Sequence, residues 1–294
     1  MATYTSLDDE IFAQSALESF VKVLQPLRAF STNFSASPGT KGASVLVPVV
    51  SNLTATTFGG SYAVCNGTKS VVTVSLTGHK FLSVGQDDLT AANSSASSLE
   101  SFGRQQGAAL ATLVMQDILS LVTTANFSLA TAVASTALDV PQLRATRLAL
   151  NQNDVPMEPR SCLLDCTPMD ALLSVTNFIQ AYAFADNQVI QEGRVRRAVG
   201  FDLYELNNLF ASGASVMGFA CHPNAIAIAM RYLQPQSGNT YEAAGPVTDP
   251  ETGLVLGLRK FYDNTTGTRY ISLEANYGYA RGLSTGGRVI KRTD

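Results

Sequence analysis

The sequence is short of charge and of the residue types that most enzymes use as acids, bases and metal ligands. Only 15% of its 294 residues are charged, against about 25% in an average globular domain. It has two histidines, four cysteines and no tryptophan. Because charge is depleted in the buried centres of protein interfaces, this composition fits a subunit of a large assembly. It fits an ordinary domain with a neutral surface equally well.

Signals for several other protein classes are also absent from the sequence. No apolar run approaches the roughly 20 residues that a membrane span needs, and the polar, acidic first ten residues are unlike a standard signal peptide. The net charge is −3, and without a block of Lys or Arg nothing favours sequence-specific nucleic-acid binding. Sparse, irregular cysteines indicate a reducing compartment. We therefore expect a cytosolic product with no membrane partner.

Candidate sites for chemistry are few and weak. Cys162 and Cys166 are the best metal candidates, with Cys221 and His222 as a second pair. On a strand the first two would lie about 13 Å apart, too far for one zinc ion with sulfur ligands at about 2.3 Å. Buried free thiols are the favoured interpretation, and His79 fits a surface or capping role. We predict no catalytic residue, no metal and no cofactor.

Two N-terminal segments look unable to bury a core of their own. Apolar residues recur at threes and fours over residues 7–24, just before Pro26, which predicts a short amphipathic helix. Such a helix is marginal alone, so we expect it to dock on this subunit or on a neighbour. Valine-rich runs at 45–50 and 71–76 predict a long hairpin. A lone hairpin has too little core, so this one is expected to extend from the body and to be stabilised by neighbours.

The rest of the chain reads as one long helix, a mixed α/β region and a final hairpin. The helix is predicted over residues 96–123, with Ser97 and Glu100 as its capping box and with Gly103 and Gly107 either weakening it or marking close packing. The later elements are predicted as a helix from Asp139 to Gln152, a strand at 160–165, helices at 167–175 and 224–232, and strands at 200–204, 254–261 and 270–279.

Several short motifs occur in a telling order. Val71 to Leu82 leads to Asp87-Asp88 and the long helix, which ends near Phe127; Val155-Pro156 precedes Arg160 to Leu164; Glu192-Gly193-Arg194 precedes Gly200 to Tyr204; and Gly218 to Ala227 reads GFACHPNAIA. Together they resemble the major capsid proteins of tailed phages, which share the Hong Kong 97 fold. The resemblance covers nearly the whole chain.

The resemblance implies an α+β fold of five parts. These are an N-terminal arm with a short helix (1–30), an extended β-hairpin or E-loop (31–92), a spine helix of the peripheral domain (93–126), an α/β axial domain (127–250) and a C-terminal peripheral-domain β-hairpin (251–294). Expected contacts between subunits are Phe12, Phe20, Phe58, Tyr62, Lys69, Arg194, Arg196 and Arg197, with an ion pair between subunits as one role for the three arginines.

The resemblance also implies partners and a location. Copies of the chain would form hexamers and pentamers in an icosahedral shell around the double-stranded DNA genome, enclosed without sequence-specific contacts. The shell would assemble in the host bacterial cytoplasm and become the capsid of the virion. No long coiled coil precedes the N-terminal helix, so the scaffolding protein is expected to be separate. A portal is expected too, and a decoration protein is left open. No Lys–Asn–Glu self-crosslinking set is recognisable.

Two alternatives stay open at this level. One is a cellular, encapsulin-like compartment built on the same fold, which neighbouring genes would distinguish from a phage shell. The other is an enzyme with Cys221 as nucleophile beside His222. Adjacent residues seldom point at each other, which makes this enzyme the weaker alternative.

Overall fold

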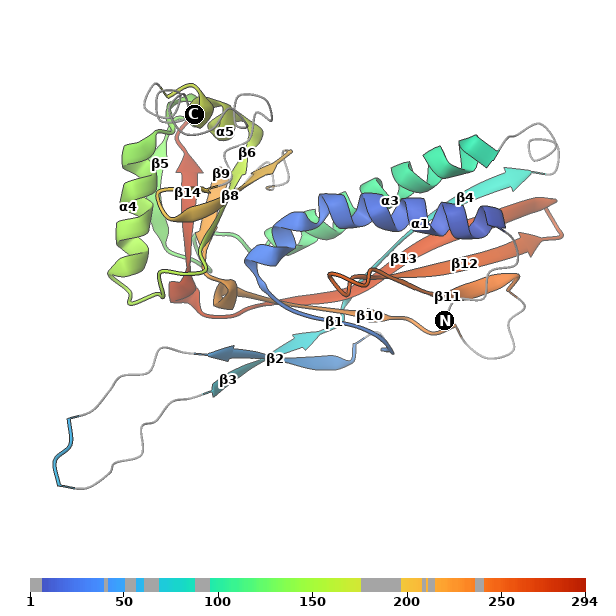
Figure 1. The fold of residues 1–294 in the computed structure, drawn as a ribbon, viewed down its shortest axis with the longest axis horizontal. Coiled ribbons are helices and arrows are strands. Elements are labelled where there is room, and N and C mark those ends of the chain that lie inside the picture. The colour runs from blue at the N-terminus through green and yellow to red at the C-terminus, as the bar shows by residue number, and fades with distance from the viewer. Residues whose placement is uncertain are drawn as a thin grey trace.

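The computed structural model describes residues 7–39, 42–50, 57–60, 69–87, 96–175, 197–207, 210, 215–235 and 241–294. Two six-stranded sheets and a separate two-stranded hairpin carry the fold. Figure 1 shows an elongated molecule in which the two sheets lie end to end, with a pair of long helices along one of them. The mixed α+β class expected from the sequence is confirmed.

The first sheet is built around one long strand near the C-terminus. β13 (Thr268–Arg281) pairs antiparallel with three strands, which are β4 (Gly78–Asp87), β12 (Val255–Asp263) and β10 (Ile226–Tyr232). Two further strands complete the sheet: β11 (Ala243–Thr248) beside β12, and β1 (Ser31–Pro38) parallel to β10. The β12–β13 hairpin confirms the C-terminal strands predicted from alternation.

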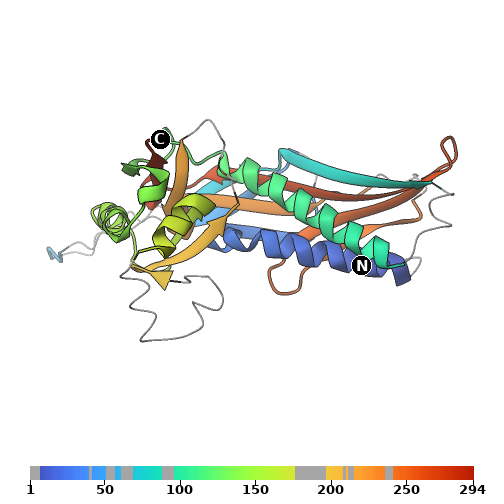
Figure 2. The same ribbon diagram turned by 90° about the horizontal axis from the view of Figure 1, so that it is seen from above.

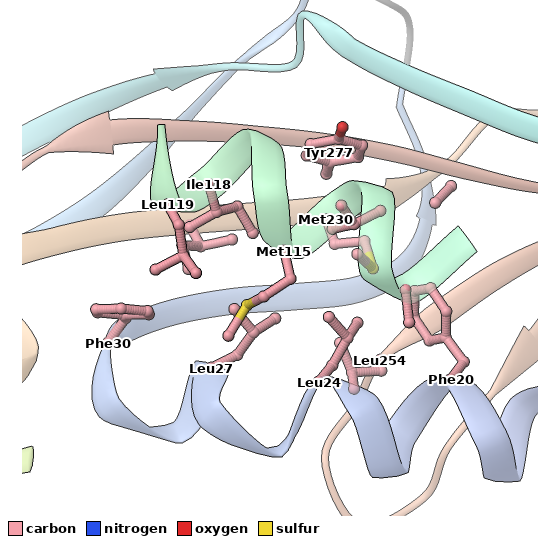
Figure 3. Packing of buried hydrophobic residues seen from close by; sticks show 14 of the residues in the cluster. Phe20, Leu24, Leu27, Phe30, Met115, Ile118, Leu119, Met230, Leu254 and Tyr277 are labelled. Carbon is pink, nitrogen blue, oxygen red and sulfur yellow. The ribbon is translucent and has the colours of Figure 1, made fainter. Parts of the chain in front are cut away.

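Two long helices that run parallel to each other cover one face of this sheet. They are α1 (Leu7–Val23) and α3 (Ala96–Leu119), and the short 3-10 helix η1 (Gln25–Ala29) follows α1. Figure 3 shows Phe20, Leu24 and Leu27 pointing from the α1–η1 segment towards Met115 of α3. The apolar cluster between them also includes Leu273, Ala275 and Tyr277 of β13. The N-terminal helix therefore docks on its own subunit, which decides between the two sites left open by the sequence.

Glycines allow α1 and α3 to lie very close together. A Cβ atom on Gly107 would lie 2.1 Å from the carbonyl oxygen of Ala16, and one on Gly103 would lie 2.5 Å from Ser15 Oγ. Both side chains would overlap α1, so close packing is the reason for glycine here. The helix begins at Ala96, one residue before Ser97, so Ser97 is not the residue that precedes the helix.

The second sheet has the order β5-β14-β9-β6-β8-β7. Its strands are β5 (Leu129–Val133), β6 (Ser161–Asp165), β7 (Arg197–Ala198), β8 (Phe201–Leu206), β9 (Val216–Cys221) and β14 (Gly287–Arg292). Helices α4 (Val140–Asn151) and α5 (Cys166–Leu173) share the apolar cluster on one face. The other face joins the α1–α3 cluster through Leu163 and Phe219, so one continuous core connects the two sheets.

The Asp139 signal for a helix start is confirmed in detail. The side chain of Asp139 accepts a hydrogen bond from the backbone N–H of Val140 at 2.6 Å, and Gln142 Oε1 accepts one from the N–H of Asp139 at 3.1 Å. Pro141 occupies the first turn, where its missing N–H is harmless. The strand predicted at 160–165 and the helix near 167–175 are also confirmed as β6 and α5.

The helix predicted at 224–232 is wrong, because this segment is strand β10 after a single turn of 3-10 helix at Pro223–Ala225. The pattern misleads because both faces of the strand are buried. Ile228 and Met230 face the helices, whereas Ala227 and Ala229 lie against the base of the β2–β3 hairpin. The strand alternates large and small apolar residues, so it lacks the polar face that usually reveals a strand.

The N-terminal hairpin is smaller than the segment expected at 31–92. Its strands are β2 (Ser44–Val50) and β3 (Lys69–Ser75), paired antiparallel in a sheet of their own. β1 and β4, which flank it, belong to the first sheet. Val47, Val49, Val74 and Leu76 pack the hairpin base onto β10, on the sheet face away from α1 and α3. The dipeptide Asn66-Gly67, which favours a tight turn between two strands, lies outside the described residues.

Candidate assembly surfaces

Two of the predicted contact residues are internal. Phe12 and Phe20 are 2% and 0% exposed, and both belong to the core between α1, α3 and the first sheet. Phe20 is part of the apolar spacing that predicts the helix, but the surface that covers both residues belongs to the same chain. The prediction that they meet another subunit is therefore wrong for the folded subunit.

Of the other predicted contact residues, three are described by the structure and three are not. Arg197 on β7 forms ion pairs with Glu158 and, at 3.8 Å, with Asp202, so its charge has partners inside the subunit. Phe58 is 64% exposed. Lys69 is the first residue of β3. Tyr62, Arg194 and Arg196 lie outside the described residues.

The β2–β3 hairpin presents apolar residues on the face that points away from its own subunit. Residues directly opposite on antiparallel strands share a face, so Leu46 and Thr73 lie beside Pro48 and Val71. Leu46 is 61% exposed and Val71 is 44% exposed. Figure 1 shows the two strands leading away from the body of the subunit. An apolar face in this position is typical of a surface that another chain covers.

The long helix α3 also has an outward face with little charge. Phe102 and Leu113 are 47% and 42% exposed, and Ala109 between them is exposed too. The charged residues along the described part of α3 have partners: Glu100 pairs with Arg104, and Asp117 pairs with Lys80 at 3.2 Å. The low charge of the whole sequence is thus visible as apolar stripes on a helix and on a hairpin.

Polar contacts fix the helix layer to the sheet. The hydroxyl of Tyr277 donates a hydrogen bond of 2.5 Å to Asp117 of α3, and Lys80 of β4 reaches the same carboxylate. Burial and the neighbouring Asp117 raise the pKa of Tyr277, so it stays a neutral donor. On the opposite face, Glu274 binds both Arg259 at 2.9 Å and His79 at 3.2 Å.

The buried cysteines lack the properties of a catalytic nucleophile. Cys162 and Cys221 are fully buried, and burial raises the pKa of Cys162 to about 12 and that of Cys221 well above its ordinary value. A nucleophilic cysteine needs the opposite shift, towards the thiolate. Nδ1 of His222 accepts a hydrogen bond from the backbone N–H of Asn224 at 3.3 Å. The Cys221 nucleophile therefore has no support from the geometry.

The described part of the chain gives no support to a metal-binding or membrane-spanning protein. There, no three His, Cys, Asp or Glu side chains gather as a metal site requires. Among the same residues, no helix is long and apolar enough to cross a membrane. The features that remain are outward apolar faces on the hairpin and on α3. Together with the fold, they are typical of a structural subunit that binds other chains.

Comparison with known proteins identifies the class. The family described as phage capsid protein matches residues 90–236, which is half of the chain. No curated protein matches the sequence. The chain belongs to the phage capsid protein family. It is a major capsid protein of the tailed-phage type, and copies of it form the shell of the virion.

Solved structures support the same fold at low identity. The chain is similar to a protein of Mycobacterium phage Che8, with 15% identity, a TM-score of 0.55 and coverage of 86% of this chain and 85% of that one. It also resembles the capsid of cyanophage P-SCSP1u, with 13% identity, a TM-score of 0.57 and coverage of 90% and 87%. The capsid of an empty GTA particle matches with 11% identity, a TM-score of 0.52 and coverage of 92% and 90%. These likenesses confirm the Hong Kong 97 type of fold.

Proposed function

We propose that the β2–β3 hairpin is the E-loop of this capsid protein and that its outer face is covered by a neighbouring copy. The observation that carries this proposal is the pair of exposed residues Leu46 and Val71 on the face opposite to the buried Val47 and Val74. Burying an apolar side chain is favourable by roughly 1.5–3 kcal/mol when it is complete. The exposed side chains of Leu46 and Val71 gain this energy when another chain covers them.

The two sheets with their helices correspond to the two domains expected for a capsid subunit. The first sheet with α1 and α3 serves as the peripheral domain, with α3 as its spine helix, and the second sheet with α4 and α5 serves as the axial domain. The domain limits follow the sheets more closely than the sequence order. β10 and β11 of the segment 127–250 lie in the first sheet, and β14 of the segment 251–294 lies in the second.

The shell encloses double-stranded DNA without reading its sequence, and its copies form hexamers and pentamers. The net charge of −3 supports enclosure without specific phosphate binding. A separate scaffolding protein and a portal act during assembly in the host bacterial cytoplasm, and a decoration protein can bind outside. Since one similar structure is the capsid of a GTA particle, extraction and sequencing of the enclosed nucleic acid tests whether it is the phage genome.

Shell formation by hairpin variants tests the proposed role. Replacing residues 51–68 by an Asn-Gly turn keeps β2 and β3 paired, because this dipeptide favours a two-residue hairpin turn. The variant should remain a folded subunit with an unchanged circular dichroism spectrum, but closed shells should be lost in negative-stain micrographs. Normal shells from this variant would contradict the E-loop assignment.

Point substitutions separate the outer face of the hairpin from general surface effects. Leu46→Asp places a charge on the face proposed to meet a neighbour, whereas Leu148→Asp changes a similarly exposed leucine, 56% exposed on α4. We expect the yield of shells to fall at least tenfold for Leu46→Asp and to stay near that of the parent for Leu148→Asp. An equal effect of both variants would show that any added surface charge disturbs assembly.

A further inference from the structure

The outer edge of the first sheet is an unprotected strand. In the described part of the chain β4 pairs along one edge only, in ten consecutive residue pairs with β13 and without a bulge. Figure 2 shows β4 along the outer margin of the sheet. The edge of a strand that has no neighbouring strand offers a row of N–H and C=O groups that can pair with another strand.

The other edge strands are all shorter than β4, and most carry a further feature that discourages such pairing; β3 of the hairpin has seven residues and no proline. β1 contains Pro38 and a register irregularity, β2 contains Pro48, and β11 contains Pro246. In the second sheet, β5 has five residues and β7 has two. β4 has ten residues and no proline. Its lysine does not guard the edge either, because Lys80 is turned to Asp117 of α3 at 3.2 Å.

An exposed aromatic residue and a covered glycine lie on the same face of β4. Phe81 is 65% exposed, the highest value among the large exposed apolar side chains described. A Cβ atom on Gly85 would lie 2.9 Å from Cε1 of Tyr270 and 3.0 Å from Cγ2 of Thr268. Tyr270 therefore leans over Gly85 and leaves an apolar surface where a side chain from outside could rest.

We propose, on the basis of the capsid function above, that β4 pairs antiparallel with β4 of a second copy around a two-fold axis through Ser83. In this register the facing residues are Phe81 with Gly85, Leu82 with Val84, Lys80 with Gln86, and His79 with Asp87. Each phenyl ring covers the glycine of the partner strand and meets Tyr270, an arrangement that strengthens glycine-containing edges. No two like charges face each other, as stable cross-strand pairing requires.

The symmetry of this pairing suits a closed shell. Antiparallel strands are related by a two-fold axis normal to the sheet, so the same patch serves both copies. Such an axis leaves α1 and α3 of both copies on the same side of the joined sheet. All copies in a shell must present the same side outwards, and this contact satisfies that condition. The two sheets become one, with the strands about 4.8 Å apart.

Cysteine substitution tests both the partner and the register. In Ser83→Cys shells the two introduced thiols face each other with Cβ atoms about 4.5–5.5 Å apart, within easy reach of a disulfide. In the matched variant Phe81→Cys, the same residue in two copies is separated by about 13 Å along the strands. After oxidation of purified shells, most Ser83→Cys protein should run as a dimer on a non-reducing gel. Phe81→Cys and the parent, with its native cysteines, should remain monomeric.

Three results would overturn the pairing. They are monomeric Ser83→Cys protein in intact oxidised shells, an equal dimer yield from Phe81→Cys, or a reconstruction of parent shells in which β4 does not pair with another β4. The reconstruction decides the question even when the cysteine variants fail to assemble. Closed shells with unpaired β4 edges would refute only this pairing, whereas absence of closed shells from the parent protein would refute the proposed function.

Discussion

Gly107→Ala is expected to destabilise the subunit although alanine favours helices. The added Cβ would lie 2.1 Å from the carbonyl oxygen of Ala16, 2.8 Å from its carbonyl carbon and 3.0 Å from its Cα. All three are backbone atoms, so no side-chain rotation relieves the overlap. The two helices must separate by roughly 1 Å, which weakens the dispersion contacts of every side chain between them.

The expected magnitude follows from two opposing terms. Overpacking of a close-packed contact costs about 1–3 kcal/mol, and the rigid backbone obstacle places this site at the upper end. Alanine in place of glycine stabilises a helix interior by about 1 kcal/mol. The free energy of unfolding should therefore fall by about 1–2 kcal/mol. Urea denaturation of the unassembled subunit, followed by circular dichroism, measures this change.

Two companion variants make the test specific. Gly103→Ala should cost less, since its nearest neighbour at 2.5 Å is the rotatable hydroxyl of Ser15 and its nearest backbone atom, the carbonyl oxygen of Phe12, lies at 2.8 Å against 2.1 Å at Gly107. Adding Ala16→Gly to Gly107→Ala should give no rescue, because the obstructing atoms belong to the backbone. A Gly107→Ala subunit as stable as the parent, or rescue by Ala16→Gly, would refute the proposed close contact between α1 and α3.

Other predictions concern buried polar groups and thiols. Tyr277→Phe removes the hydrogen bond to Asp117 and should lower the free energy of unfolding by about 1–3 kcal/mol in the same urea assay; no change would show that the contact is unimportant. Arg160→Lys loses some of the hydrogen bonds from the Arg160 guanidinium to the 151–156 segment. The free energy of unfolding should fall by about 2 kcal/mol, measured by thermal unfolding, and an unaltered melting temperature would contradict this. Cys221 should react with iodoacetamide only after unfolding, since burial raises its pKa; fast labelling of the folded subunit would revive the nucleophile hypothesis. Burial also raises the pKa of Cys162 to about 12, so its contribution to stability is fully present below about pH 8.5 and is lost as the pH rises towards 12. The free energy of unfolding should accordingly fall less with alkaline pH for Cys162→Ala than for the parent, and equal slopes would contradict this.

The sequence correctly predicted those helices and strands that depend on residues close together in the chain. Asp139 and Pro141 mark the start of α4 because capping involves neighbouring residues only. Alternation marks β13, whose Leu273 and Ala275 face the helices. The second face of this strand was less predictable, since Glu274 is only 5% exposed. Its burial depends on Arg259 and His79, which come from two other strands.

Contacts between distant segments explain what the sequence could not reveal. β10 looked helical because the hairpin covers its alanines and the helices cover its larger residues. Phe12 and Phe20 looked like contacts between subunits because their partner, α3, lies about eighty residues further along the chain. The apolar outer faces of the hairpin and α3 likewise become visible only when it is known which residues the subunit itself covers.

An electron cryomicroscopy reconstruction of shells formed by the purified parent protein tests the central claim most directly. We expect a closed icosahedral shell in which the outer face of the β2–β3 hairpin, with Leu46 and Val71, is buried against a neighbouring copy. A shell in which this face lies open to solvent, or a protein that forms no closed particles with or without its scaffold, would contradict it.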